Sequence, residues 1–221
     1  MPLSAKHLIL GTFLVAQAGC VINVKSGSHS GRNIDKVFGS IDVDAGEIVG
    51  DVETVNGRIS LDDNVVAEVV ETVNGSIDLG DNVEVRDAST TNGSIKTGEN
   101  LTVTRDLETV NGSIRVNRNG DIRGSIETVN GSIMLRGSRV GQDVETLNGD
   151  IDIVRGSVVE GDVIFNENGN NWGNDNDPPR LRIDAESAVK GSIRLYREVR
   201  LDIDPDAEVG EIVEFEDRGR W

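Results

Sequence analysis

The stretch Glu71-Thr72-Val73-Asn74-Gly75-Ser76-Ile77 is one copy of a motif that recurs through the middle of this 221-residue sequence. The Asn-Gly pairs of six successive motif copies are separated by 18, 18, 19, 19 and 18 residues. Self-similarity at such a period is typical of a repeat protein in which each copy forms one structural unit. The six aligned asparagines are Asn56, Asn74, Asn92, Asn111, Asn130 and Asn148.

Two further positions keep the same residue in all six copies. A threonine stands two residues before each asparagine, at Thr54, Thr72, Thr90, Thr109, Thr128 and Thr146. An isoleucine stands three residues after it, at Ile59, Ile77, Ile95, Ile114, Ile133 and Ile151. Weaker copies flank the array at 38–41, 190–193 and 209–212.

Each copy divides into three short segments of alternating polarity, joined at corners rich in Gly, Asn and Asp. These corner residues tolerate positive φ. The pattern predicts an all-β fold, a single-stranded parallel β-helix (β-solenoid) with three short strands and about 18–19 residues per coil. We expect the Asn and Thr columns to form ladders, in which each side chain hydrogen-bonds to its copies in the neighbouring coils.

An antiparallel meander is the alternative, because Asn-Gly between alternating strands also favours a hairpin. A meander does not require interior, corner and exterior positions to recur together, whereas stacked coils do. The sequence between Phe38 and Phe165 contains no aromatic residue. A narrow coil interior holds Val, Ile and Leu but has little room for rings, so the solenoid is favoured.

The first twenty residues have the features of an export signal. The apolar run Leu8–Ala16 is too short to span a bilayer, and Ala18-Gly19-Cys20 resembles the end of a lipobox. Cleavage after Ala16-Gln17-Ala18 by ordinary signal peptidase is the alternative. Cys20 is the only cysteine of the chain, so an intramolecular disulfide is excluded. We predict lipidation of Cys20, whose acyl chains would anchor the protein to a membrane.

The remaining sequence divides by composition. We expect a flexible Gly/Ser tether over 21–36, the β-solenoid over 37–217 with an irregular polar loop at 166–179, and a short tail at 218–221. The loop contains Trp172, an aromatic residue that could stack on a sugar or cover an irregular coil.

The V-x-x-x-N-G-S-I coil behind an export signal resembles the bacterial adhesin-like β-solenoid family, whose domains are largely of unknown function. The resemblance covers roughly residues 38 to 165. It implies the solenoid fold and supplies no catalytic residues. The coil is also similar to that of bactofilins, the polymer-forming bacterial scaffolds, although bactofilins generally lack a cleaved signal.

The sequence offers little material for catalysis. Its only histidines, His7 and His29, fall in the predicted signal and tether, where packing cannot hold a general base. No phosphate-binding glycine loop is present. The net charge of −17 disfavours nucleic acid as a partner. We therefore expect no enzymatic activity and no cofactor.

Carboxylates are the remaining candidates for chemistry. One predicted exterior column contains Glu53, Glu71, Glu108, Glu127 and Glu145, and a second contains Asp51, Asp87, Asp106 and Asp143. Arg58, Lys96, Arg105 and Arg115 are near enough in sequence to screen them. Three interpretations remain open: a divalent-cation site, because hard oxygen ligands suit Ca²⁺; a polysaccharide-active groove; and a solvated face that keeps the protein soluble.

Together these features predict a non-enzymatic bacterial cell-envelope lipoprotein, whose rigid solenoid presents an adhesin-like or scaffold surface. We expect location at the outer membrane or its periplasmic side, with soluble secretion as the alternative. The partners would be the membrane, through Cys20, and a surface protein or glycan. Two other functions remain open: carbohydrate binding or turnover through the acidic face and the Trp172 loop, and self-assembly through the coil ends into a bactofilin-like polymer.

Overall fold

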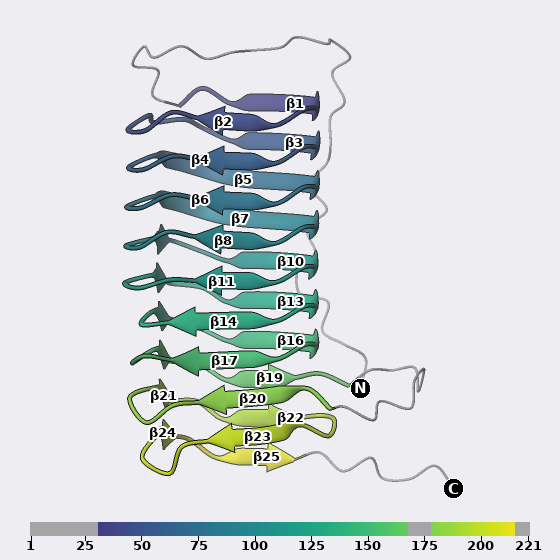
Figure 1. The fold of residues 1–221 in the computed structure, drawn as a ribbon, viewed down its shortest axis with the longest axis vertical. Helices are drawn as coiled ribbons and strands as arrows, with labels where there is room; N and C mark the ends of the chain where they lie inside the picture. Colours follow the sequence, from purple (N-terminus) through teal and green to yellow (C-terminus); the bar gives the residue numbers. More distant parts are fainter. Residues whose placement is uncertain (1–30, 168–177, 215–221) are drawn as a thin grey trace, which may run out of the picture.

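The chain folds into a β-solenoid of about nine turns with about 19 residues per turn, as the repeat predicts. The computed structural model describes residues 31–167 and 178–214, and the secondary structure of these residues consists of strands and turns. The coils stack along the long axis of the molecule (Figure 1). The strand pairs are parallel, such as Val52–Asn56 with Val66–Asn74, so the antiparallel meander is excluded.

Each coil has three sides, which we number in chain order from the repeated Thr-Val-Asn segment. The first side comprises β1 (Ile34–Phe38), β3 (Val52–Asn56), β5 (Val66–Asn74), β7 (Glu84–Asn92), β10 (Leu107–Asn111), β13 (Ile126–Asn130), β16 (Val144–Asn148), β19 (Val163–Phe165), β22 (Ile193–Leu195) and β25 (Ile212–Glu214).

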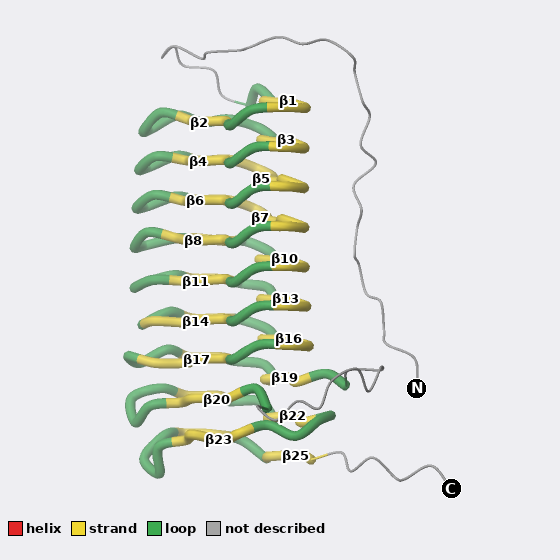
Figure 2. Tube along the Cα trace, turned by 45° about the vertical axis from the view of Figure 1, so that its right-hand side comes forward, coloured by secondary structure: helices red, strands yellow, loops and turns green. Residues whose placement is uncertain are grey.

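The second side is a separate nine-stranded sheet. It comprises β2 (Ile41–Val43), β4 (Ile59–Leu61), β6 (Ile77–Leu79), β8 (Ile95–Thr97), β11 (Ile114–Val116), β14 (Ile133–Arg136), β17 (Ile151–Val154), β20 (Arg180–Ile183) and β23 (Arg200–Ile203). Figure 2 shows these strands and those of the first side as two adjoining stacks.

The third side consists of very short strands: β9 (Thr102–Val103), β12 (Asp121–Ile122), β15 (Arg139–Val140), β18 (Val158–Val159), β21 (Ala188–Val189) and β24 (Glu208–Val209). It belongs to the same sheet as the first side, because the nine-residue strands β5 and β7 continue around the corner between them.

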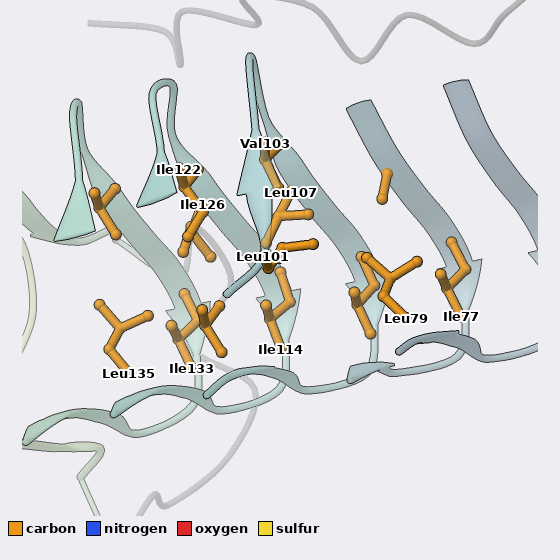
Figure 3. Packing of buried hydrophobic residues seen from close by; sticks show 14 of the residues in the cluster. Ile77, Leu79, Leu101, Val103, Leu107, Ile114, Ile122, Ile126, Ile133 and Leu135 are labelled. Atoms are coloured by element: carbon orange, nitrogen blue, oxygen red, sulfur yellow. The ribbon is translucent and has the colours of Figure 1, made fainter. Parts of the chain in front are cut away.

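The interior is a stack of mainly aliphatic side chains, joined near the C-terminal coils by the fully buried Phe165. Within each strand, alternate residues point inward, so the columns that contain Leu107, Ile114 and Ile122 fill the centre of the coil (Figure 3). All three side chains are fully buried. Burying each such side chain contributes about 1.5–3 kcal/mol, which makes these columns the main source of stability.

The Asn-Gly corner joins the first side to the second, and its glycine is required for close stacking. A Cβ at Gly112 would overlap the carbonyl oxygen of Gly93 in the preceding coil, and the other glycines of this column are equally tight. These glycines do not have positive φ. The expectation that the Asn-Gly corner depends on left-handed backbone is therefore wrong; the glycine column is needed because successive turns approach too closely for a side chain.

Left-handed backbone occurs instead at the corner between the second and third sides. Asn64, Asn82, Asn100 and Asn119 have φ values of 61°, 56°, 59° and 59°. Asparagine tolerates this conformation better than most residues. Its amides also stack: Asn100 Nδ2 donates to Asn82 Oδ1 at 2.9 Å, and Asn119 Nδ2 donates to Asn100 Oδ1 at 2.9 Å. This second Asn column was missed at the level of sequence.

The stack continues past the predicted loop. Strand β20 pairs with β17, with Leu181 opposite Ile151, so the loop is an insertion at the Asn-Gly corner. The segment 190–193 is not the weak copy of the Asn-Gly-Ser-Ile corner that its sequence suggested. Ile193 pairs with Val163 on the first side and is not an equivalent of Ile151 on the second. At the other end, β1 begins at Ile34, inside the predicted tether, because Ile34 fills the inward position beside Val52.

Candidate functional site

The Asn column forms the predicted ladder. In five successive steps from Asn74 to Asn148, Nδ2 of each asparagine donates to Oδ1 of the asparagine in the preceding coil at 2.9 Å. The ladder therefore has one direction and ends with an acceptor, Asn148 Oδ1. Arg197 Nη1 donates to that oxygen at 2.8 Å and to the carbonyl of Leu147 at 3.0 Å. The six asparagines therefore hydrogen-bond neighbouring coils to each other.

The Thr column is in register but does not form the predicted ladder. Each threonine is buried, and its hydroxyl donates to the carbonyl of a corner glycine in the preceding coil. Thr72 Oγ1 donates to Gly57 O at 3.0 Å, and Thr109 Oγ1 donates to Gly93 O at 2.9 Å. The same pattern holds for Thr54, Thr90, Thr128 and Thr146. The hydroxyl satisfies a carbonyl that the tight corner leaves without a strand partner.

The Asp column also has a structural role. Its side chains lie at the corner between the third and first sides, and each accepts a hydrogen bond from the backbone of the next coil. Asp106 Oδ1 accepts from the Ser125 N–H at 2.8 Å, and Asp143 Oδ1 accepts from the Asp162 N–H at 2.7 Å. Asp51 and Asp87 make longer bonds of the same kind. Each carboxylate of this column therefore already accepts a hydrogen bond from a backbone N–H group.

The Glu column runs along the outward face of the first side. Register pairs Glu53 with Glu71, Glu108 with Glu127, and Glu127 with Glu145, and Ser89 interrupts the column. Asp35 extends it by one coil, opposite Glu53. Neighbouring members stand about 4.8 Å apart along the stack. The structure thus brings together all five glutamates that the sequence singled out.

The cations expected to screen this column lie elsewhere. Arg58 Nε pairs with Asp78 at 2.9 Å, and Arg105 Nη1 approaches Asp87 at 3.7 Å. Lys96 and Arg115 lie in register with each other on the second side. Among the ion pairs of residues 31–167 and 178–214, none includes a member of the Glu column. The expectation of Arg and Lys screening is therefore wrong.

Partial burial without a counter-ion raises the pKa of Glu53, Glu71, Glu108 and Glu127. Desolvation is the main cause, followed by repulsion from neighbouring acids, and the pKa of Glu108 and of Glu127 rises from 4.5 to about 7. The pKa values of Glu53 and Glu71 are also raised, chiefly by desolvation. Glu145 accepts a hydrogen bond from Asn166 Nδ2. A column of acids next to its own copies resists ionisation.

An apolar column lies beside the Glu column, two residues further along each strand. It contains Val37, Val55, Val73, Val110, Val129 and Leu147, with Thr91 as the single interruption. Val129 is 37% exposed, and Phe38, next to Val37, is 78% exposed. The valine of the T-V-N motif was visible in the sequence. Its outward position follows from the alternation of the strand, although the only apolar positions singled out in the sequence were inward ones.

The acidic face does not form a compact metal site. No group of three His, Cys, Asp or Glu side chains in the described part of the chain is arranged to hold a metal ion. The column places its carboxylates in a line along the axis, whereas Ca²⁺ requires ligands that surround it. The candidate metal ligands Glu53, Glu71, Glu108, Glu127 and Glu145 therefore do not converge.

The other candidates lie outside the described residues: Cys20 with the predicted signal at 1–20, His7, His29, Trp172 and the tail at 218–221. Within 31–167 and 178–214, no helix is long and apolar enough to cross a membrane. No protein-family model, curated protein or solved structure matches this chain.

Proposed function

We propose that this chain is a non-enzymatic bacterial cell-envelope lipoprotein, whose solenoid acts as a rigid surface for adhesion or assembly. The observation that carries the proposal is that some of the repeated columns bond within the scaffold and others do not. Asn, Thr, Asp and Gly are used within the scaffold, in ladders, backbone caps and tight corners. The Glu and Val columns are left on an outward face with no such role.

The scaffold suits a function in which shape and charge are presented. About nine coils spaced at about 4.8 Å make a rod roughly 43 Å long, with its columns held in fixed register. Anchoring through acylated Cys20 would hold this rod at a membrane. The similarity of the coil to adhesin-like β-solenoids supports the same conclusion.

Mass spectrometry of the N-terminus of the exported protein tests the anchor. We expect a mature chain that begins at diacylated or triacylated Cys20 and sediments with membranes. Cys20→Ser should release the same folded domain into the soluble fraction. A mature chain that begins at Gly19 with a free Cys20 thiol would contradict the proposal.

Association through a coil end is the second candidate, and the C-terminal coil favours it. Leu201 and Ile212 are 38% and 40% exposed, although their register partners Leu181 and Ile193 are fully buried. An apolar strand edge of this kind is a site for pairing with another chain. Sedimentation equilibrium tests this function: concentration-dependent oligomers that Leu201→Asp abolishes would support it, and a monomer at high concentration would exclude it.

A further inference from the structure

We propose that the outward face of the first side, over β3, β5, β7, β10, β13 and β16, docks a cationic amphipathic helix of a partner protein. This inference rests on the proposed function and deepens it, because it names the presenting face and the chemistry of its partner. The face is defined by the Glu column and the Val column, which run side by side along the axis.

The acids of this face have no cation beside them among the described residues, and a cation would stabilise their ionised forms. Glu71, Glu108 and Glu127 have no ion-pair partner among the described residues, although they are partly desolvated. Two of the basic residues expected to screen the column, Arg58 and Arg105, pair with Asp78 and Asp87. A partner that brings Lys or Arg over the column would remove both the repulsion between neighbours and the cost of ionisation.

The adjoining apolar column indicates that the cations are carried on an apolar surface. Val110 and Val129 stand in the same coils as Glu108 and Glu127, two residues further along the strand. Two residues of a strand span about 6.6 Å, so the two columns are parallel stripes at side-chain distance. A lysine stem can pack along valine while its ammonium group reaches the carboxylate. Free metal ions or simple polyamines would leave the valine stripe uncovered.

The spacing of the columns favours a helix over an extended peptide. Groups on one face of a helix recur at about 5.4 Å per turn, close to the coil spacing of about 4.8 Å. On an extended peptide, side chains of one face recur at about 6.8 Å, which is out of register after two coils. Over the five steps from β3 to β16 a helix drifts by about 3 Å, which flexible lysine side chains can accommodate.

The second side lacks this combination. Its outward column has mixed charge, with Asp78, Lys96 and Arg115 in successive coils. Two acids of that side, Asp78 and Asp152, are paired with Arg58 and Arg180. A cationic helix would meet repulsion from Lys96 and Arg115 on that side.

Isothermal titration calorimetry with a synthetic Leu/Lys peptide tests the proposal on the purified protein. The peptide should have about 16–18 residues, the length of a helix that spans the six coils, with leucines on one face and lysines flanking them. A scrambled peptide of identical composition has the same charge without an apolar face. We expect micromolar binding of the amphipathic peptide and about tenfold weaker binding of the scrambled one.

Matched variants locate the binding. Glu108→Gln with Glu127→Gln should weaken the affinity about tenfold, and Val110→Ser with Val129→Ser should weaken it by a similar factor. The control pair, Asp42→Asn with Asp62→Asn, removes the same number of carboxyl groups at exposed positions off the first side. It should change the affinity by less than about twofold.

Equal weakening by the control pair, or equal binding of the scrambled peptide, would overturn the proposal, because either shows non-specific attraction to an acidic protein. Absence of peptide binding would also overturn it. Neither result depends on Cys20, so failure of the helix-docking proposal would leave the lipoprotein proposal untouched. Mass spectrometry of the N-terminus tests the lipoprotein proposal separately. Circular dichroism of each variant, with a thermal transition no lower than that of the parent protein, confirms that losses in affinity are not losses of fold.

Discussion

The outward faces of the first and second sides stand on the same coils but arrange charge in opposite ways. On the first side, acids are stacked on acids without a cation, and the pKa of Glu108 and of Glu127 is raised to about 7. On the second side, acids and bases are interspersed, as in the pair of Arg58 with Asp78. One scaffold therefore supports a face of mixed charge, on which some acids pair with arginines, and a face on which acids are stacked without a cation.

The difference shows that an acidic column is not a consequence of the fold. The solenoid requires the same backbone register on both sides, yet the second side places Asp78, Lys96 and Arg115 in one column. Solubility alone would be met by the mixed arrangement at a lower electrostatic cost. The acidic column is thus a property of one face, which substitutions can probe separately from the core.

The largest effect is expected from breaking the core that both faces share. Ile114→Asp places a charge among fully buried aliphatic side chains and should unfold the domain. Arg115→Asp introduces the same residue at the adjacent outward position and should leave the fold intact. Circular dichroism and thermal melting measure both. A folded Ile114→Asp protein would show that the inward column is misassigned.

The next largest effect is expected at the corner between the two faces. Gly112→Ala forces a Cβ against the carbonyl of Gly93 and should lower the free energy of unfolding by about 2–4 kcal/mol, because backbone must move in two coils. Ser113→Ala, one residue further, should cost less than about 1 kcal/mol. Chemical denaturation distinguishes the two. Equal stabilities would mean that the turns are not packed as closely as described.

A smaller effect, specific to the first face, is expected from pH. Because the folded pKa of Glu108 and of Glu127 lies near 7, above the ordinary value of 4.5, their protonated forms favour the folded state. This contribution is fully present below pH 4.5 and is lost as the pH rises to about 7. Stability should therefore fall across that window, by on the order of 1 kcal/mol per group after solvent screening.

The double variant Glu108→Gln with Glu127→Gln isolates that contribution. It should flatten the decline in stability between pH 4.5 and 7 and should be more stable than the parent protein at neutral pH. Thermal melts at several pH values measure the slope. The Asp42→Asn with Asp62→Asn pair should keep the parental slope, and a slope that survives in the glutamine variant would contradict the assignment.

The smallest effect is expected on the second face. Arg58→Ala removes the ion pair with Asp78, in which the arginine side chain is 57% exposed. Exposed pairs of this kind contribute about 0–1 kcal/mol, so the melting temperature should change little. High salt should reduce the difference further. A loss as large as that of Gly112→Ala would show that the two faces are not energetically distinct.

Much of the fold follows from the sequence because its evidence is local. The spacing of Asn56, Asn74 and Asn92 sets the coil, and alternation around Thr72 separates inward from outward positions. The same alternation identifies the Glu column as an exterior line. The adhesin-like and lipoprotein assignments stay predictions, since they depend on Cys20 and on resemblance.

The sequence predicted the partners of the Asn column but not those of the Thr, Asp and Glu columns. Asp106 and Glu108 are both outward acids two residues apart, yet Asp106 accepts a backbone N–H of the next coil and Glu108 does not. That distinction depends on how the corner turns. Similarly, the Thr109 hydroxyl reaches the carbonyl of Gly93 because the corner leaves that oxygen beside it.

The sequence by itself determined the period, the core columns and the existence of an exterior acidic line, and it favoured parallel stacking over a meander. These follow from repeat spacing and from strand alternation, which are properties of the chain alone. Only the tertiary structure decided that Gly112 is needed for close approach, that the Asp column caps backbone, and that Arg58 and Arg105 are directed away from the Glu column. Those outcomes depend on distances between residues one coil apart, which are set by the shape of the corners.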